Sequence, residues 1–175
     1  MLEGSNRLIL LDRDGVLNVD RVNSVRTVAD LEVESGAIEG CRLLKDAGYP
    51  LGVISNQSAV GRGWMSEADL DAVNAELDRR LGGVIDAWFV CPHAPDDGCR
   101  CRKPGTLLLE QAQAEFGFDP RLTWFVVDAD RDVEAARRFG CRPALLRTGK
   151  GPAAIAAYPD VPAFDDLADF ARALT

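Results

Sequence analysis

Histidine, lysine and long apolar runs are all scarce in this 175-residue chain. It has one histidine and three lysines, and no apolar run approaches the roughly 18 residues of a membrane-spanning helix. The first seven residues also lack the basic and apolar segments of a secretion signal, so the sequence predicts a cytoplasmic protein. The chain has 28 acidic and 20 basic residues, and this net charge of −8 argues against nucleic-acid and membrane partners.

The apolar residues, 47% of the chain, predict one globular domain over residues 1–175, which we expect to be a monomer. Short apolar segments alternate with segments of helical period, which is typical of an α/β fold with a doubly wound parallel sheet. The expected strands are Leu8–Leu11, Leu51–Ser55, Ala87–Val90, Trp124–Val127 and Ala144–Arg147. The expected helices are Ile38–Ala47, Ser66–Leu81, Thr106–Phe116, Asp132–Phe139 and Phe164–Leu174, and Gly149–Pro162 is expected to be the loosest stretch.

Two carboxylates directly follow the first expected strand, in the sequence Asp12-Arg-Asp14-Gly. Carboxylates two residues apart at a strand end point the same way, and they suit a divalent cation with a nucleophile and an acid/base partner. Asp and Gly are also ordinary turn residues, so this motif alone does not separate a site from a turn.

Polar groups follow the later strands as well. They comprise Ser55-Asn-Gln-Ser58, then Arg102-Lys103-Pro104, and a second acidic group that begins at Asp128. In such a sheet, ligands bind beyond the carboxyl ends of the strands. Hydroxyl, amide, lysine and carboxylate groups at that edge are the groups that phosphoryl transfer needs, namely a nucleophile, metal ligands and positive groups around the phosphate oxygens.

The single histidine lies among three of the five cysteines, in the sequence Cys91-Pro-His93, five further residues and Cys99-Arg-Cys101. This spacing lets one loop close around a tetrahedral ion, and three cysteines with one histidine favour Zn²⁺ over a redox thiol pair or buried free thiols. Four protein ligands leave no position for water, so we expect a structural zinc that fixes the loop before Lys103. Cys41 and Cys141 are expected to be inert core residues.

The four polar motifs, in this order and over nearly the whole chain, resemble those of the haloacid dehalogenase (HAD) superfamily phosphatases. The resemblance implies that Asp12 is the nucleophile that forms an aspartyl-phosphate and that Asp14 is the general acid and base. It implies a Mg²⁺ held by Asp12, the main-chain carbonyl of Asp14 and Asp128. It also implies substrate contacts from Arg13, Asp20, Ser55, Asn56, Gln57, Arg62, Arg102 and Lys103.

A cysteine-histidine loop before Arg-Lys-Pro resembles one branch of this superfamily, which includes heptose bisphosphate and histidinol-phosphate phosphatases. Three segments resemble the heptose members, namely Asp12–Asp20, Ser55–Trp64 and Arg147–Gly149. The resemblance implies removal of the carbon-7 phosphate of D-glycero-D-manno-heptose 1,7-bisphosphate, on the way to nucleotide-activated heptose for cell-surface polysaccharide. A substrate with two phosphates gains from a second guanidinium, and Arg102, beside Lys103, is a better candidate than Arg62.

Two other interpretations stay open at this point. One is a histidinol-phosphate phosphatase. The other is a weakly active relative that binds a phosphosugar or a protein partner, because Val127 and Ala129 stand where the family has glycine and a lysine or small polar residue.

Overall fold

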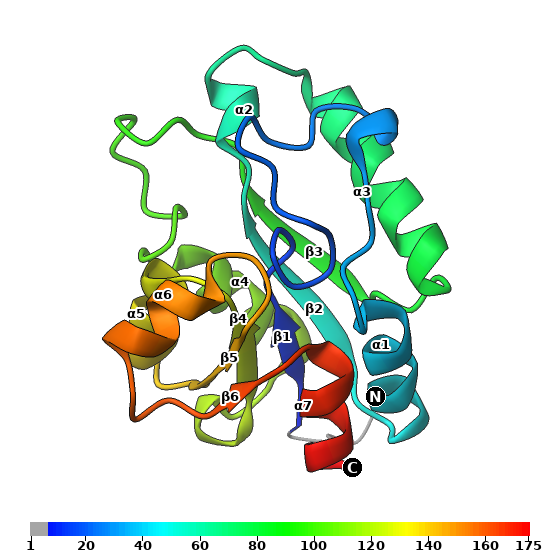
Figure 1. Cartoon of the computed structure of the whole chain (residues 1–175). Coiled ribbons are helices and arrows are strands. Elements are labelled where there is room, and N and C mark those ends of the chain that lie inside the picture. The colour runs from blue at the N-terminus through cyan, green and yellow to red at the C-terminus, as the bar shows by residue number, and fades with distance from the viewer. Residues whose placement is uncertain (1–6) are drawn as a thin grey trace.

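The computed structural model describes residues 7–175, and its centre is a six-stranded sheet of parallel strands (Figure 1). The strand order β3-β2-β1-β4-β5-β6 confirms a doubly wound sheet, and the direction of strand addition reverses beside β1, where ligands of such sheets bind. The strands are β1 (Ile9–Leu11), β2 (Leu51–Asn56), β3 (Ala87–Cys91), β4 (Trp124–Val127), β5 (Arg142–Leu146) and β6 (Ala163–Phe164).

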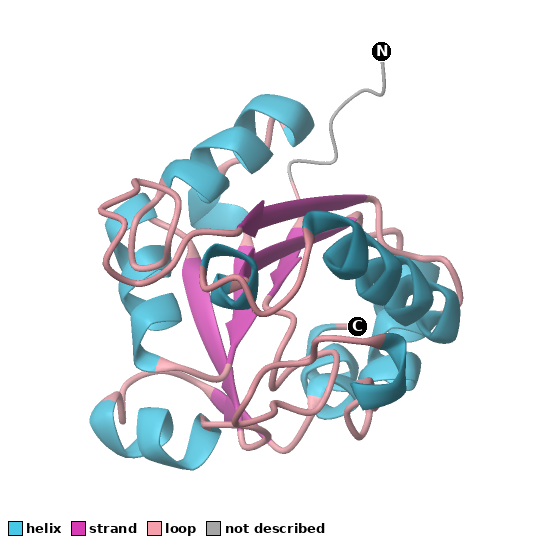
Figure 2. Cartoon of the chain, turned by 90° about the horizontal axis from the view of Figure 1, so that it is seen from above, coloured by secondary structure: helices cyan, strands magenta, loops and turns pink. Residues whose placement is uncertain are grey.

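Helices cover both faces of this sheet (Figure 2). They are α1 (Ala37–Asp46), α2 (Ser58–Gly61), α3 (Glu67–Leu81), α4 (Leu107–Phe116), α5 (Asp130–Phe139), α6 (Gly151–Ala157) and α7 (Leu167–Leu174). On one face α1, α3 and α7 bury an apolar cluster that includes Leu44, Leu77 and Phe170. On the other face α4, α5 and α6 bury a second cluster. Two apolar layers therefore hold the sheet rigid and leave its carboxyl edge free for polar groups.

The expected strands and helices are present, with ends within three residues of the expected ones. At the start of α3 the Ser66 hydroxyl accepts a hydrogen bond from the N–H of Asp69 at 3.1 Å, which caps the helix as its sequence indicates. Helices α4 and α5 end at Gly117 and Gly140, which have left-handed backbone conformations. These local signals explain why the boundaries were readable from the sequence.

The C-terminal quarter differs from the expectation. Residues 149–162 were expected to be the loosest stretch, but they contain helix α6, whose Pro152 lies in the first turn, where a missing N–H costs nothing. Phe164 belongs to β6 and not to the last helix, which begins at Leu167. Helix α5 starts at Asp130, two residues before the expected start, and the short helix α2 was not expected.

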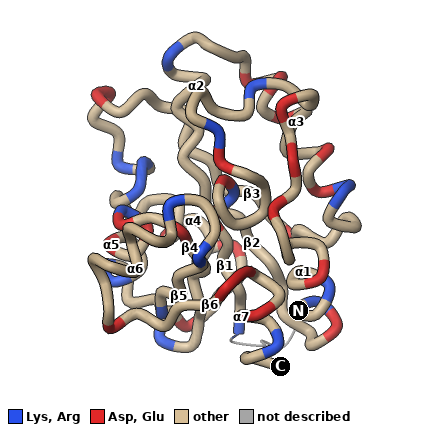
Figure 3. Tube along the Cα trace, viewed as in Figure 1, with Lys and Arg blue, Asp and Glu red and all other residues tan. Residues whose placement is uncertain are grey.

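Acidic and basic residues are interspersed along the trace (Figure 3). Among the described residues, none of the helices has the length and apolar character to cross a membrane.

Candidate active site

The carboxyl edge of the sheet brings together residues that are distant in the sequence. Asp12 directly follows β1, Asp128 directly follows β4, and Ser55 and Asn56 end β2. Because β1 lies between β2 and β4, these three strand ends are neighbours. The N–H of Asp12 also donates to the carbonyl of Val126 at 3.0 Å, which continues the ladder past the strand end.

Lys103 forms the electrostatic centre of this edge. Its Nζ lies 2.9 Å from Asp12 Oδ1, 2.9 Å from Asp132 Oδ1 and 2.8 Å from the carbonyl of Ile54. The lysine is 2% exposed. Burial by itself lowers the pKa of Lys103, but Asp12 and Asp132 raise it above its ordinary value. The amine is therefore a fixed positive charge beside Asp12.

The Asp14 carboxylate is held by donors on both oxygens. Its Oδ1 accepts from Arg13 Nη2 at 3.0 Å and from Asn18 Nδ2 at 2.9 Å, and its Oδ2 accepts from Gln57 Nε2 at 2.6 Å. Burial raises the pKa of Asp14, but the charge of Arg13 and these hydrogen bonds bring it below the ordinary value. The group is thus an oriented carboxylate at the cavity wall.

Asp128 lies between two backbone segments. A Cβ on Gly15, whose φ is +83°, or on Gly149, whose φ is +55°, would collide with its carboxylate. The main-chain N–H of Lys150 donates to Asp128 Oδ2 at 2.9 Å. Glycine at both positions therefore lets the backbone approach and orient this carboxylate.

The carboxylates fit a divalent cation. Oxygen atoms of Asp12, Asp128 and Asp132 lie within 4.8 Å of one another, and Asp132 is already paired with Lys103. Burial, with repulsion from Asp132, raises the pKa of Asp12 to about 7, and burial, with repulsion from Asp12, raises the pKa of Asp128 to about 7. Hard oxygen donors with uncompensated buried charge form the donor set that Mg²⁺ prefers.

A cavity of about 150 Å³ opens above this centre. Of the residues expected to bind substrate or metal, six line it: Asp14, Asp20, Asn56, Gln57, Arg102 and Asp128. The sequence interpretation missed six more lining residues: Arg21, Val22, Ser24, Ser58, Arg131 and Lys150. Asp12 and Lys103 lie just behind the lining residues and are 5% and 2% exposed. Asp12 is close to the Asp128 carboxylate, and Lys103 donates its main-chain N–H to the Asn56 side-chain amide.

Besides Lys103, three residues expected to contact substrate do not line this cavity. Arg13 is fully buried, and it bridges Asp14 to Asn74 of α3, with Nη1 2.9 Å from Asn74 Oδ1. Ser55 is buried and accepts from Gln57 Nε2 at 2.8 Å. Arg62 packs on Trp64, with its Cζ 5.0 Å from the ring centroid. Their side chains support cavity residues or neighbouring loops in this arrangement.

Asn56 also has a supporting role. Its Oδ1 accepts from the N–H of Lys103 at 3.0 Å, and its Nδ2 donates to the carbonyl of Lys103 at 3.2 Å. This pair of hydrogen bonds ties the end of β2 to the segment that carries the lysine.

Two guanidinium groups at the cavity have unused donors. Arg102 Nη1 and Arg131 Nε are buried without a hydrogen-bond partner, and the nearest ion pair of Arg131 is with Asp132, at 4.0 Å. Buried donors without partners are costly, so these nitrogens suit an anion in the cavity.

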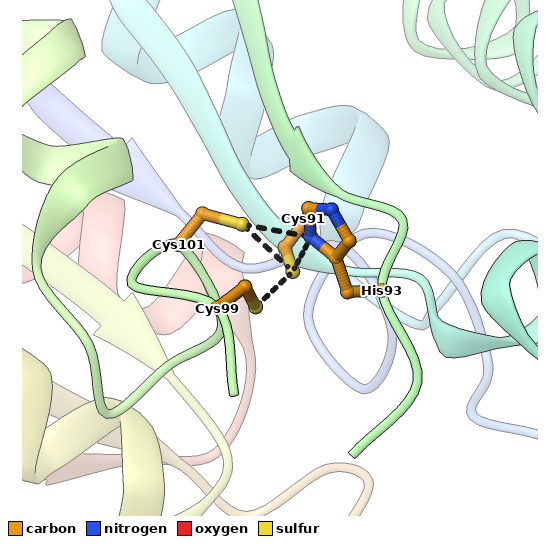
Figure 4. A group of neighbouring side chains, drawn as sticks. All are labelled: Cys91, His93, Cys99 and Cys101. Atoms are coloured by element: carbon orange, nitrogen blue, oxygen red, sulfur yellow. Dashed lines mark hydrogen bonds between the residues drawn. The ribbon is translucent and has the colours of Figure 1, made fainter. Parts of the chain in front are cut away.

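The cysteine-histidine cluster lies on the loop that follows β3 (Figure 4). Cys91 Sγ is 3.5 Å from His93 Nδ1, 3.6 Å from Cys99 Sγ and 3.1 Å from Cys101 Sγ. All four donor atoms lie within 4.8 Å of one another. Tetrahedral Zn²⁺ with bonds of about 2.0–2.3 Å has donor separations of similar size, so the donor set fits this ion.

The two residues that favoured a weakly active relative are both accommodated by packing. Val127 is fully buried in the apolar cluster under α4 and α5, and Ala129, 7% exposed, is the residue before α5. The β-branched side chain of Val127 therefore packs in the core and not against the site.

Comparison with known proteins agrees with this geometry. The family model described as HAD-hydrolase-like matches residues 100–170. Together with the paired aspartates, the buried lysine and the sheet order, the similarity to known relatives makes this chain a phosphatase of the HAD superfamily.

Individual relatives indicate which phosphatase family within the superfamily this chain resembles. D-glycero-β-D-manno-heptose-1,7-bisphosphate 7-phosphatase of Pseudomonas aeruginosa is 41% identical over 97% of this chain and 98% of its own length. The α-anomer phosphatase of Photorhabdus laumondii is 34% identical over 82% and 84%. The D,D-heptose 1,7-bisphosphate phosphatase of Bordetella bronchiseptica, solved with magnesium and phosphate, superposes with a TM-score of 0.91 at 34% identity, covering 96% of this chain and 97% of that one. This chain belongs to the heptose 1,7-bisphosphate 7-phosphatase family.

Proposed function

We propose that this protein hydrolyses the carbon-7 phosphate of D-glycero-β-D-manno-heptose 1,7-bisphosphate through an aspartyl-phosphate on Asp12. The observation that carries the proposal is the meeting of Asp12, Lys103 and Asp128 at one cavity edge in a chain that is 41% identical to a phosphatase of that name. The β anomer is preferred because the relative with 41% identity acts on it, whereas the α-anomer relative is 34% identical.

In the first step a carboxylate oxygen of Asp12 attacks phosphorus, and the bond between phosphorus and the sugar oxygen breaks. Lys103 and the main-chain N–H of Arg13, 2.8 Å from Asp12 Oδ1, hold that oxygen and leave Oδ2 for attack. Asp14 gives a proton to the departing oxygen, because a phosphate anion beside it raises its proton affinity.

In the second step Asp14 takes a proton from water, whose oxygen attacks phosphorus and releases inorganic phosphate and the free Asp12 carboxylate. Arg13, Asn18 and Gln57 orient Asp14 for both transfers. Gln57 and Ser58, at the start of α2, provide polar groups on the cavity wall for the transferred group.

Asp12, Asp128 and the main-chain carbonyl of Asp14 would hold Mg²⁺, which offsets the repulsion between the attacking carboxylate and the phosphate. The raised pKa values of Asp12 and Asp128 support this assignment, because burial and then repulsion between neighbouring carboxylates disfavour their charged forms, which a bound cation would stabilise.

Arg102 and Arg131 would bind the second phosphate of the substrate. Both residues line the cavity, and each has a buried guanidinium nitrogen without a hydrogen-bond partner. A planar guanidinium can also donate two parallel hydrogen bonds to two oxygens of one phosphate. Asp20 and Lys150, 3.3 Å apart at the same cavity, would contact sugar hydroxyls.

We also propose that Cys91, His93, Cys99 and Cys101 hold a structural Zn²⁺. The four donors leave no position for water, and the loop they close leads directly to Arg102 and Lys103. The ion would therefore fix the entry of these two side chains into the site.

All groups in this proposal come from one chain, so the proposed site needs no second subunit, and we propose that the protein is a monomer. We also propose that it acts in the cytoplasm. Size-exclusion chromatography at micromolar concentration checks the first point, and a stable dimer would contradict it.

The test is Mg²⁺-dependent phosphate release from both anomers of the heptose bisphosphate, histidinol phosphate and fructose 1,6-bisphosphate. We expect the β-heptose substrate to give the highest kcat/KM. A higher kcat/KM for histidinol phosphate would contradict the proposed substrate. If no compound in the panel releases phosphate, the protein would instead be a binding protein without turnover.

A further inference from the structure

A turn after β1 forms one wall of the cavity. Residues 21–26, here called the cavity turn, place Arg21, Val22 and Ser24 along it. The N–H of Ser24 donates to the carbonyl of Arg21 at 3.0 Å, and Ser24 has a φ of +64°, which a residue with a side chain rarely adopts. Val22 is completely exposed. Such a turn keeps its shape only if neighbouring groups hold it.

Two contacts anchor the C-terminal end of the cavity turn. Val25 is fully buried in the core cluster of β1 and α1. Arg26 packs on Trp64, with its Cζ 4.5 Å from the ring centroid, and its Nε donates to the carbonyl of Asn23 at 2.8 Å. The guanidinium thus links the middle of the turn to the indole of a different loop.

Trp64 is well placed to receive that contact. The main-chain N–H of Trp64 donates to the carbonyl of Ala59 in α2 at 2.8 Å, and the next residue, Met65, is buried against Ala59 and Leu70. Arg62 also lies over the ring, at 5.0 Å. Trp64, which is 44% exposed, contacts both guanidinium groups with its ring and lines a second, more open hollow of about 470 Å³ that shares Ser24 with the reaction cavity.

We propose that Trp64 is a positioning residue for substrate selection, which acts through Arg26 on the cavity turn. Trp64 lines the second hollow and not the reaction cavity, so we expect its effect to fall on the part of the substrate beyond the reacting phosphate. This inference rests on the proposed function, since it takes the heptose bisphosphate as the large substrate.

The experiment compares wild type, Trp64→Ala and Trp64→Phe on the heptose bisphosphate and on acetyl phosphate, which has almost nothing beyond the reacting phosphate. Loss of an exposed cation–π contact should raise KM for the bisphosphate about two- to fivefold in Trp64→Ala, with kcat unchanged. Acetyl phosphate turnover should stay at the wild-type level, and Trp64→Phe, which keeps an aromatic face, should restore KM.

Limited trypsin digestion provides a readout that does not depend on the substrate, because the cavity turn contains Arg21 and Arg26. Cleavage after these residues should be faster in Trp64→Ala and return to the wild-type rate in Trp64→Phe. Unchanged KM and unchanged cleavage would overturn the inference, as would an equal loss on both phosphate substrates. A wild-type enzyme without preference for the bisphosphate would instead reject the proposed function, and the digestion would still decide the role of Trp64.

Discussion

Two clusters of side chains in this molecule could hold a metal ion, and they are built in opposite ways. The carboxylate cluster takes Asp12, Asp128 and Asp132 from the ends of β1 and β4 and the start of α5, so the sheet topology assembles it. The cysteine-histidine cluster comes from the end of β3 and one loop, within residues 91–101. The first depends on the whole fold being formed, whereas the second depends on a short segment and, if zinc binds, on the ion itself.

The same contrast appears in the electrostatics. The three carboxylates are buried, with none more than 5% exposed, and Lys103 compensates only part of their charge. In the loop cluster, His93 is exposed and Cys99 is partly exposed. A change that leaves charge unpaired in the first cluster should therefore lower both catalysis and stability, and changes in the second should mainly affect local order.

The largest effect is expected for Asp12→Asn. An amide cannot act as the nucleophile, so kcat should fall more than about a thousandfold. The fold should persist, because Lys103 keeps its ion pair with Asp132. Phosphate release and thermal unfolding check both points, with the exposed Asp96→Asn as control. Turnover at a tenth of the wild-type rate would reject Asp12 as the nucleophile.

Lys103→Met should impair both activity and stability. It leaves Asp12 and Asp132 buried without their cation, which costs about 3–5 kcal/mol of unfolding free energy. Catalysis should fall about a hundredfold or more, because a fixed positive charge at the reacting group is lost. Urea unfolding, with Lys45→Met of the partly exposed Lys45–Asp86 pair as control, measures the first effect. Equal destabilisation by the two variants would contradict the contrast between buried and surface charge.

Arg131→Gln should affect substrate affinity more than the chemical step. Loss of a charge-assisted hydrogen bond to the second phosphate should raise KM for the bisphosphate about tenfold. Turnover of acetyl phosphate should not change. The exposed Arg121→Gln serves as control, and steady-state kinetics on both substrates provides the measurement. An unchanged KM would contradict the assignment of Arg131 to the second phosphate site.

Cys99→Ser should have the smallest effect on catalysis. We expect zinc content to fall from about one ion per chain to almost none, with a lower unfolding temperature and less than about a tenfold loss of kcat. Metal analysis of protein purified without chelator, with Cys141→Ser as control, tests this. Wild-type protein without zinc would contradict the assignment of the cluster.

The sequence was informative where the signal is local. Short apolar segments between segments of helical period located the strands. Helix ends were located by capping residues such as Ser66 and Gly117. The ligand spacing of residues 91–101 predicted a cluster whose four donor atoms the structure does bring together. Asp12 and Asp128 were identified because polar groups follow buried strands and resemble a known motif order.

The sequence was less informative where tertiary contacts decide. Asp132 was seen only as part of an acidic run, because nothing local shows that it faces Lys103 across the site. Lys150 was missed because residues 149–162 contain the Gly, Ala and Pro of a loose segment, yet pack as α6. Arg62 was expected to contact substrate, and the sequence did not indicate that its guanidinium packs on Trp64, two residues away.

The close approach of Gly15 and Gly149 to the Asp128 carboxylate has a consequence for how the sequence can vary. The two glycines are far apart in the chain, yet a Cβ at either would meet the same oxygen atom, Oδ2 of Asp128. A Cβ on Gly149 would also lie 2.7 Å from the main-chain Cα of Gly15, so shortening Asp128 would not relieve that collision and would remove the carboxylate. In a library of random variants, positions 15 and 149 should therefore behave as a single intolerant unit.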